Sequence, residues 1–267
     1  MNYYLLIAAT ALAPLCFADT PAPQLNCDHP SHTAGLASFC RMVEVPAAFL
    51  GQLTVTTDVG GVSVTGWDNP GVLVRARIET SAPDAVAAQT LAWQVQADVA
   101  ADRVSASGPA QAARHNWTLT FEIFLPHEAN LSLTTKVGGV SIADVKGDIR
   151  FNTSTGGVSL TRLAGDVQGS TKVGGIAIVL GGDHWDGTAL KADTSVGGIE
   201  IDAPLNYSAH FAVSTALGNI ATTFPVAPSS APAPAGLGHK LTFDMGSGGA
   251  AIEASTSVGG IVIKGID

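Results

Sequence analysis

Short runs in which aliphatic residues alternate with small or polar ones recur along this chain, and each run follows a pair of glycines. The copies are VGGVSV (59–64), VGGVSI (137–142), TGGVSL (155–160), VGGIAI (173–178), VGGIEI (196–201), VGGIVI (258–263) and a degenerate LGNIAT (217–222). Alternation with a period of two residues is typical of a β-strand that buries one face. The pattern therefore predicts many short strands of one repeated kind.

The intervals between the copies indicate that these strands stack in coils. After Gly138 the motif recurs at intervals of 18, 18, 23 and 21 residues, a period of the size found in solenoid proteins. Stacking would align the aliphatic residues in two columns, one of Val140, Val158, Ile176 and Ile199 and one of Ile142, Leu160, Ile178 and Ile201. The predicted fold is all-β, a parallel β-helix (β-solenoid).

The glycine pairs are predicted to be structural corners between strands. A tight corner repeated in every coil requires a positive φ or a close approach of backbones, which a side chain would obstruct. The paired residues are Gly60, Gly61, Gly138, Gly139, Gly156, Gly157, Gly174, Gly175, Gly197, Gly198, Gly259 and Gly260. A phosphate-binding loop is disfavoured, because no Lys-Ser/Thr follows any pair and no GxGxxG motif opens a helix. Gly147-Asp148 and Gly165-Asp166 predict a second corner half a coil away.

The chain before residue 130 has a less regular pattern and predicts a cap on the coils. Strand-like alternation occupies residues 41–80 and resumes over 93–125. Between them, the Ala-rich stretch 83–93 predicts one short helix with Val86 and Leu91 in its apolar stripe. Near the other end, the Pro-rich stretch 225–238 predicts a loop, because proline cannot continue a strand ladder.

The first residues predict export. Residues 3–15 form an apolar run that is too short to span a bilayer but fits the core of a signal peptide cleaved after Ala18. A lipidated Cys16 is disfavoured because bulky Leu15 precedes it. The predicted divisions are a signal peptide (1–18), an N-terminal segment with a disulfide loop (19–45) and a β-solenoid domain (46–267), regular from about 130. The predicted location is the periplasm, the cell surface or the extracellular space.

Two cysteines follow the predicted signal peptide. In an oxidising compartment, a disulfide between Cys27 and Cys40 is the expected outcome. The alternative is a zinc site that combines both cysteines with His29 and His32, although the spacing is irregular for zinc.

Charge and motifs narrow the classes of function. The net charge of the 267-residue chain is −9 and its 13 Lys and Arg residues are scattered, which argues against a nucleic-acid partner. No GxSxG or HExxH motif is present, so no catalytic residue, metal site or cofactor is predicted. The cluster Asp183-His184-Trp185-Asp186 could contact a sugar or a metal, but a tryptophan beside turn acids is more often a packing plug.

Hydroxyl residues precede the glycine pairs and would align if the coils stack. They could form a hydroxyl surface for ice or glycans, or they could be ordinary strand residues. The residues are Thr134, Thr135, Thr153, Thr155, Ser170, Thr171, Thr194, Ser195, Ser214, Thr215, Thr256 and Ser257.

The segments FEIFLPHEANLSLTTKVGGVSI, GDIRFNTSTGGVSLTRLAGDV, GDHWDG, LGHKLTFDMGSGGAAI and VGGIVI, within residues 121–267, resemble the bacterial putative-adhesin family of β-strand repeat proteins. Its members are domains of unknown function, also called toast-rack or head adhesin domains. The resemblance implies a parallel β-helix in the cell envelope or outside the cell, and it supplies no catalytic residues. Family members commonly carry Asn-Gly-Gly where this chain has Val-Gly-Gly.

These observations favour a non-enzymatic, exported interaction module, with adhesion as the role that the resemblance implies. The alternative is a carbohydrate-binding or carbohydrate-active β-helix, which would require Trp185 and nearby acids to line a groove. The expected partner is an unknown protein or glycan. The coil that ends at Ile266-Asp267 is expected to leave an open sheet edge guarded by Lys264, through which the protein could form homo-oligomers.

Overall fold

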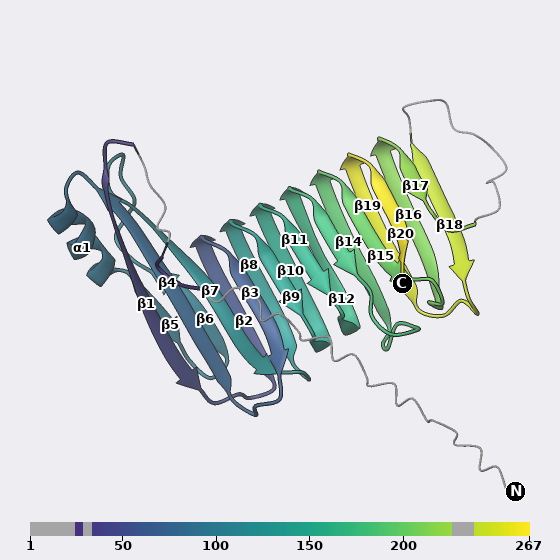
Figure 1. Cartoon of the computed structure of the whole chain (residues 1–267), viewed down its shortest axis with the longest axis horizontal. Coiled ribbons are helices and arrows are strands. Elements are labelled where there is room, and N and C mark those ends of the chain that lie inside the picture. The colour runs from purple at the N-terminus through teal and green to yellow at the C-terminus, as the bar shows by residue number, and fades with distance from the viewer. Residues whose placement is uncertain (1–24, 29–33, 226–237) are drawn as a thin grey trace, which may run out of the picture.

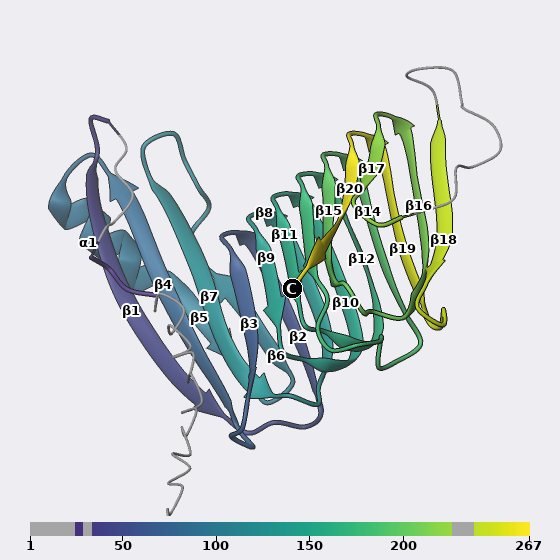
Figure 2. The same ribbon diagram turned by 45° about the vertical axis from the view of Figure 1, so that its right-hand side comes forward.

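The structure, a computed structural model, describes residues 25–28, 34–225 and 238–267, so the predicted signal peptide and most of the Pro-rich stretch lie outside it. The protein is all-β with one short helix, as predicted. Its strands form two ten-stranded sheets that share one hydrophobic core (Figures 1 and 2). Within the described ranges, no helix has the length and apolar character needed to cross a bilayer.

The first sheet, sheet A, is parallel from β7 to β17 and antiparallel among β1, β4 and β7. In spatial order it consists of β1 (Ala37–Ala47), β4 (Val72–Ala82), β7 (Asn116–Pro126), β3 (Val62–Trp67), β9 (Val140–Ala143), β11 (Val158–Thr161), β13 (Ile176–Val179), β15 (Ile199–Pro204), β20 (Ile261–Ile266) and β17 (Ile220–Thr222).

The second sheet, sheet B, is parallel from β16 to β6, and its two outermost pairs are antiparallel. In spatial order it consists of β18 (His239–Met245), β16 (Ala209–Leu217), β19 (Ala251–Val258), β14 (Ala189–Val196), β12 (Ala164–Val173), β10 (Lys146–Thr155), β8 (Asn130–Val137), β2 (Gln52–Val59), β6 (Arg103–Ser107) and β5 (Gln96–Val99).

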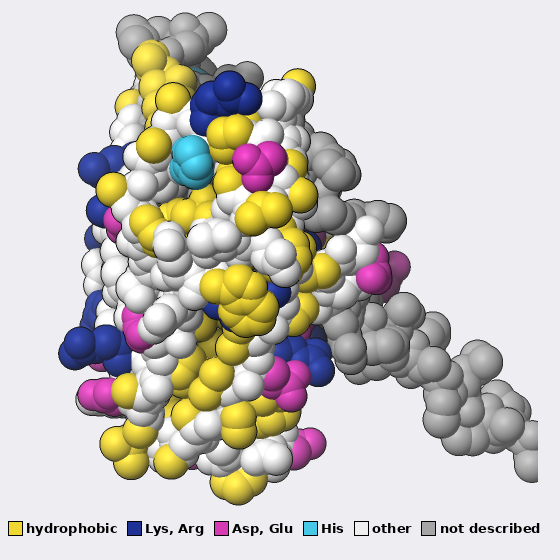
Figure 3. Space-filling view, turned by 90° about the vertical axis from the view of Figure 1, so that its left-hand side faces the viewer, with side chains coloured by type: hydrophobic (Ala, Val, Ile, Leu, Met, Phe, Trp, Pro, Cys, Tyr) yellow, Lys and Arg dark blue, Asp and Glu magenta, His cyan; other side chains and the backbone are white. Residues whose placement is uncertain are grey.

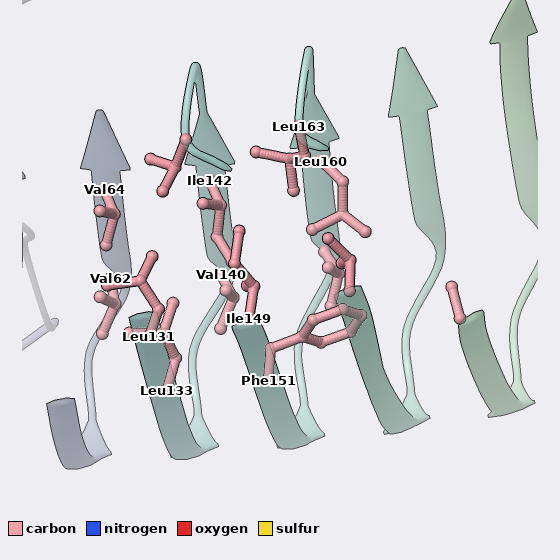
Figure 4. Packing of buried hydrophobic residues seen from close by; sticks show 14 of the residues in the cluster. Val62, Val64, Leu131, Leu133, Val140, Ile142, Ile149, Phe151, Leu160 and Leu163 are labelled. Carbon is pink, nitrogen blue, oxygen red and sulfur yellow. The ribbon is translucent and has the colours of Figure 1, made fainter. Parts of the chain in front are cut away.

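The chain alternates between the sheets from β8 to β17, so that each strand of sheet B is followed by one of sheet A. The 18-residue interval puts equivalent positions side by side, and Val140, Val158 and Ile176 are paired in register and buried. The second predicted column, from Ile142 to Ile201, is also in register and buried. Figure 4 shows these side chains meeting residues of sheet B such as Leu133 and Phe151. Both predicted columns are therefore confirmed.

The two glycines of each pair have different surroundings at the turn from sheet B to sheet A. Gly156, a first glycine, has a φ of 156°, and a Cβ there would lie 2.0 Å from the carbonyl oxygen of Gly138 in the neighbouring coil. At Gly157, the second glycine, a Cβ would lie 3.7 Å from the nearest atom, in ordinary contact. Backbone geometry thus requires glycine at the first position, whereas Gly157 has room for a methyl group.

The second corner is not where the sequence predicted it. Gly147 and Gly165 lie inside β10 and β12, while the left-handed residues of this corner are Asp144 (φ 59°) and Arg162 (φ 48°). The Arg162 guanidinium donates two hydrogen bonds of 2.7 Å to the Asp144 carboxylate in the neighbouring coil. The predicted bend is three residues too late, but the glycines are still required. Gly147 and Gly165 have φ of 159° and 99°, and a Cβ at either would lie 2.2 Å from a backbone oxygen of the neighbouring coil.

The last coil of the chain is not at an edge, and that prediction is wrong. β20 pairs with β15 on one side and β17 on the other, and β19 lies between β14 and β16. The prediction assumed that strands stack in sequence order. Instead, β16 does not pair with β14, and β19 fills the position between them. Figure 1 shows this yellow coil, the inserted coil (β19 and β20), with a green coil on each side.

The N-terminal end is capped by helix α1 (Ala85–Gln94), which packs against β1 and β4. The Asp84 side chain accepts a 2.8 Å hydrogen bond from the amide of Ala87 and so caps the first turn. The helix buries Ala88, Leu91 and Ala92, whereas Val86 is 74% exposed, so its predicted place in the stripe is wrong. Figure 3 views this end of the molecule and shows hydrophobic side chains on its surface.

The described residues contain the predicted disulfide between Cys27 and Cys40. Since both sulfurs are bonded to each other, neither is a thiolate that could bind zinc. The two histidines of the zinc alternative, His29 and His32, lie outside the described residues. A disulfide in a chain of this size is typical of exported proteins.

Candidate binding groove

The polar cluster at residues 183–186 does not form a cleft around its tryptophan. Trp185 is only 4% exposed, and its indole Nε1 donates a 3.0 Å hydrogen bond to the carbonyl of Gly165. Asp186 pairs with Lys146 at 2.7 Å, and Asp183 pairs with His184 at 2.6 Å. The tryptophan is therefore a packing residue whose ring is not free to stack on a sugar.

The two carboxylates of this cluster stay ionised at neutral pH. The hydrogen bond from Lys146 lowers the pKa of Asp186, and the hydrogen bond from His184 lowers that of Asp183. A general acid needs the opposite shift, towards a protonated carboxyl at neutral pH. Neither group is tuned for the acid role in glycoside hydrolysis.

The hydroxyl ladder is split between the interior and the outer face of sheet B. In six coils one threonine is buried, and its Oγ1 donates to the carbonyl of a first glycine in the neighbouring coil; the donors are Thr135, Thr153, Thr171, Thr194, Thr215 and Thr256, at 2.8–3.3 Å. Thr57 is buried at the equivalent position before Gly60, but its Oγ1 makes no such bond. Thr134 and Asn152 point outward. The buried threonines brace the glycine corners, and a hydroxyl surface made from them is excluded.

Replacing Thr153 by valine is expected to lower the free energy of unfolding by about 1–3 kcal/mol. Valine has nearly the same shape, but it leaves the Gly138 carbonyl without the 3.1 Å hydrogen bond from Oγ1. Urea unfolding followed by circular dichroism would measure the change. Thr134→Val is the matched control on the exposed side, and its effect should stay within about 0.5 kcal/mol. Equal losses in both variants would contradict the bracing role.

A groove of about 830 Å³ runs along the outer face of sheet A and crosses seven strands, from β7 to β20. At ~4.8 Å per strand, six intervals make it roughly 29 Å long. Its floor includes the second glycine of each pair, and beside them stand the outward residues Ser63, Ser141, Ser159, Ala177, Glu200 and Val262. Among the described residues that line it, Glu200 is the one charged side chain, and it pairs with Lys264.

The groove exists because the second position of each pair has no side chain. A Cβ at these glycines would lie 3.3–3.7 Å from its nearest neighbour, which is slightly tight at Gly139, Gly198 and Gly260 and ordinary van der Waals contact at Gly61 and Gly157. Larger side chains would therefore project into the groove rather than into the protein. The sequence predicted both glycines as corners, but only the first is required by the turn, and the second keeps an outer surface open.

A row of half-exposed aliphatic side chains runs beside the groove, two residues earlier along the chain. This aliphatic ridge consists of Val137, Val173, Val196, Val258 and Leu217, each 45–50% exposed. Their strands place them in register, with Thr155 between the first two. Contiguous exposed apolar surface of this kind marks interaction sites. The sequence carried the signal, an aliphatic residue before nearly every glycine pair, but no role was predicted for it.

Comparison with known proteins gives likeness at the level of structure. No family model and no curated protein sequence matches the chain. One similar solved structure is a "putative cell adhesion protein" from Clostridium sporogenes ATCC 15579, with 15% sequence identity and a TM-score of 0.41; the match covers 86% of this chain and 100% of that one. A second is a "putative adhesin" from Bacteroides fragilis NCTC 9343, with 14% identity and a TM-score of 0.38, covering 85% of this chain and 97% of that one. A third is a "putative lipid binding protein" from Parabacteroides distasonis ATCC 8503, with 10% identity and a TM-score of 0.27, covering 84% of this chain and 96% of that one. Two of these three names are of the kind that the family resemblance implies.

Proposed function

We propose that this protein is a non-enzymatic, exported interaction module, adhesin-like in role, that binds an extended partner along the groove of sheet A. The observation that carries the proposal is the 830 Å³ groove, whose floor is kept open by glycines that the backbone does not require. The architecture that we propose behind it is a β-solenoid with two broad faces, in which each coil along the groove contributes one glycine and one outward residue, small in four of the six.

The chemistry of the groove favours a long, weakly charged partner, either a polypeptide or a glycan. Its walls repeat every strand, so a polymer with a short repeat can make the same contact several times. The aliphatic ridge adds apolar surface along the same direction. Carbohydrate cleavage is not favoured, because Trp185 is in the core and the neighbouring acids do not line the groove.

Export fits this role because binding surfaces for polymers are used in the cell envelope or outside the cell. The Cys27–Cys40 disulfide supports an oxidising location such as the periplasm or the cell surface. The groove itself stays nearly neutral, because Glu200, the one charged side chain among the described residues that line it, pairs with Lys264.

The experiment is a binding assay with a groove-filling variant. The protein is tested on an array of cell-surface polysaccharides and extracellular-matrix proteins, as wild type and as Ser159→Trp, which places an indole in the groove. Binding to any retained probe should weaken at least tenfold, about 1.4 kcal/mol. Asn152→Trp, on the exposed face of sheet B, is the control and should bind as the wild type does.

Two results would overturn the proposal. One is a wild-type protein that retains none of the probes. The other is equal binding by Ser159→Trp and the wild type, provided that both melt at the same temperature by circular dichroism.

A further inference from the structure

The inserted coil occupies a slot whose two walls are made earlier in the chain. One wall is β14 and β15, and the other is β16 and β17. Since β14 and β16 are both hydrogen-bonded to β19, the walls lie two strand spacings apart, roughly 9.6 Å. The inserted coil is bonded to both walls by parallel ladders, including Gly197 N to Val258 O and Gly259 N to Leu217 O, each 2.9 Å.

Side chains on the coil match the wall formed by β14 and β15. Ile252, Ile261 and Ile263 are fully buried between the two sheets. On the outer faces, Glu253 lies opposite Lys191 at 3.9 Å, and Lys264 pairs with Glu200. The backbone ladders and the buried isoleucines fix the place and register of the coil, and the two exposed ion pairs, of opposite polarity, add complementary charge.

The segment that leads into the coil is built as a hinge. Residues 246–250 read Gly-Ser-Gly-Gly-Ala, and Gly246, Gly248 and Gly249 all have positive φ, at 58°, 74° and 133°. The amide of Gly248 bonds to the carbonyl of Met245 at 3.0 Å, which turns the chain back toward the slot. Glycines in such a loop can also adopt extended conformations at little steric cost.

We propose that the inserted coil exchanges between two copies of this chain, so that each copy fills the slot of the other. The partner is therefore a second copy, recognised by the same isoleucines and ion pairs that hold the coil in one chain. Only the hinge differs between the two forms, which is the condition under which domain swapping has a low cost. When extended, the six steps from Met245 to Ala251 span up to about 20 Å, enough to carry β19 out of its own slot.

The exchange would give a role to a coil that is placed last in the chain but in the interior of the sheets. A reciprocal swap forms a symmetric dimer and puts two grooves on one particle, which raises the avidity for a polymer. The exchange itself does not depend on what the groove binds.

The test uses cysteines placed on either side of one slot wall. Asp193 on β14 lies directly opposite Ser255 on β19, with a 2.5 Å hydrogen bond between the side chains. Asp193→Cys and Ser255→Cys proteins are mixed, passed together through mild denaturant, refolded and oxidised. A swapped pair brings the two cysteines together, so disulfide-linked dimer between the two variants should form at least tenfold above a control mixture. The control replaces Ser255→Cys by Ser132→Cys, exposed on β8.

Two outcomes decide the proposal. A chain carrying both Asp193→Cys and Ser255→Cys should close an internal disulfide, which shows that the site can form the bond. Equal linkage in the two mixtures would then overturn the exchange.

Discussion

Replacing Gly156 by alanine is expected to destabilise the protein by about 3–5 kcal/mol, among the largest losses caused by a single methyl group. The added methyl group is unfavourable for two reasons. The φ of 156° is one that residues with a side chain rarely adopt, and the new Cβ would lie 2.0 Å from the carbonyl oxygen of Gly138. That oxygen belongs to the preceding coil. The clash can therefore be relieved only if the two coils move apart, which weakens the hydrogen bonds between β8 and β10.

The adjacent glycine supplies the control. Gly157→Ala adds the same methyl group one residue later, where its nearest neighbour is 3.7 Å away and φ is not left-handed. Its free energy of unfolding should change by less than about 1 kcal/mol. Urea unfolding of both variants measures the difference directly. If the two alanines cost the same, the division of each pair into a structural and an open glycine is wrong.

The repeat made the centre of this fold predictable. Equal intervals of 18 residues force equivalent strands into register, so the partners of Val140 and Ile142 could be read from the sequence. The disulfide and the short helix were also predictable, because each depends on residues close together in the chain.

Features that depend on spatial order were not predictable in the same way. Nothing in the motif at 258–263 distinguishes a coil that ends the stack from one inserted between two others. The connection from β15 to β16 decides this order, because there the chain passes over one strand position, the one that β19 occupies. Tyr207 is buried in this connection. The groove was missed for a related reason, since a glycine looks the same in a sequence whether a turn requires it or merely accepts it.

Removing residues 251–267 is expected to abolish the cooperative fold of the C-terminal half. The deletion takes away Ile252, Ile261 and Ile263, all fully buried, at about 1.5–3 kcal/mol each, or roughly 5–9 kcal/mol together. A loss of that size equals much of the ~5–15 kcal/mol that stabilises an ordinary domain. It also leaves four strand edges unpaired, on β14, β15, β16 and β17.

An edge coil would behave differently, and this makes the deletion decisive. Had the coil been at the end of the stack, its removal would expose one new edge in each sheet and leave the remaining coils folded. Thermal unfolding by circular dichroism and limited trypsin digestion would separate the cases, with a chain lacking only Ile266 and Asp267 as the control. The control should melt within a few degrees of the full chain, because all three buried isoleucines remain. A cooperative transition in the 251–267 deletion near that temperature would show that the coil does not hold its neighbours together.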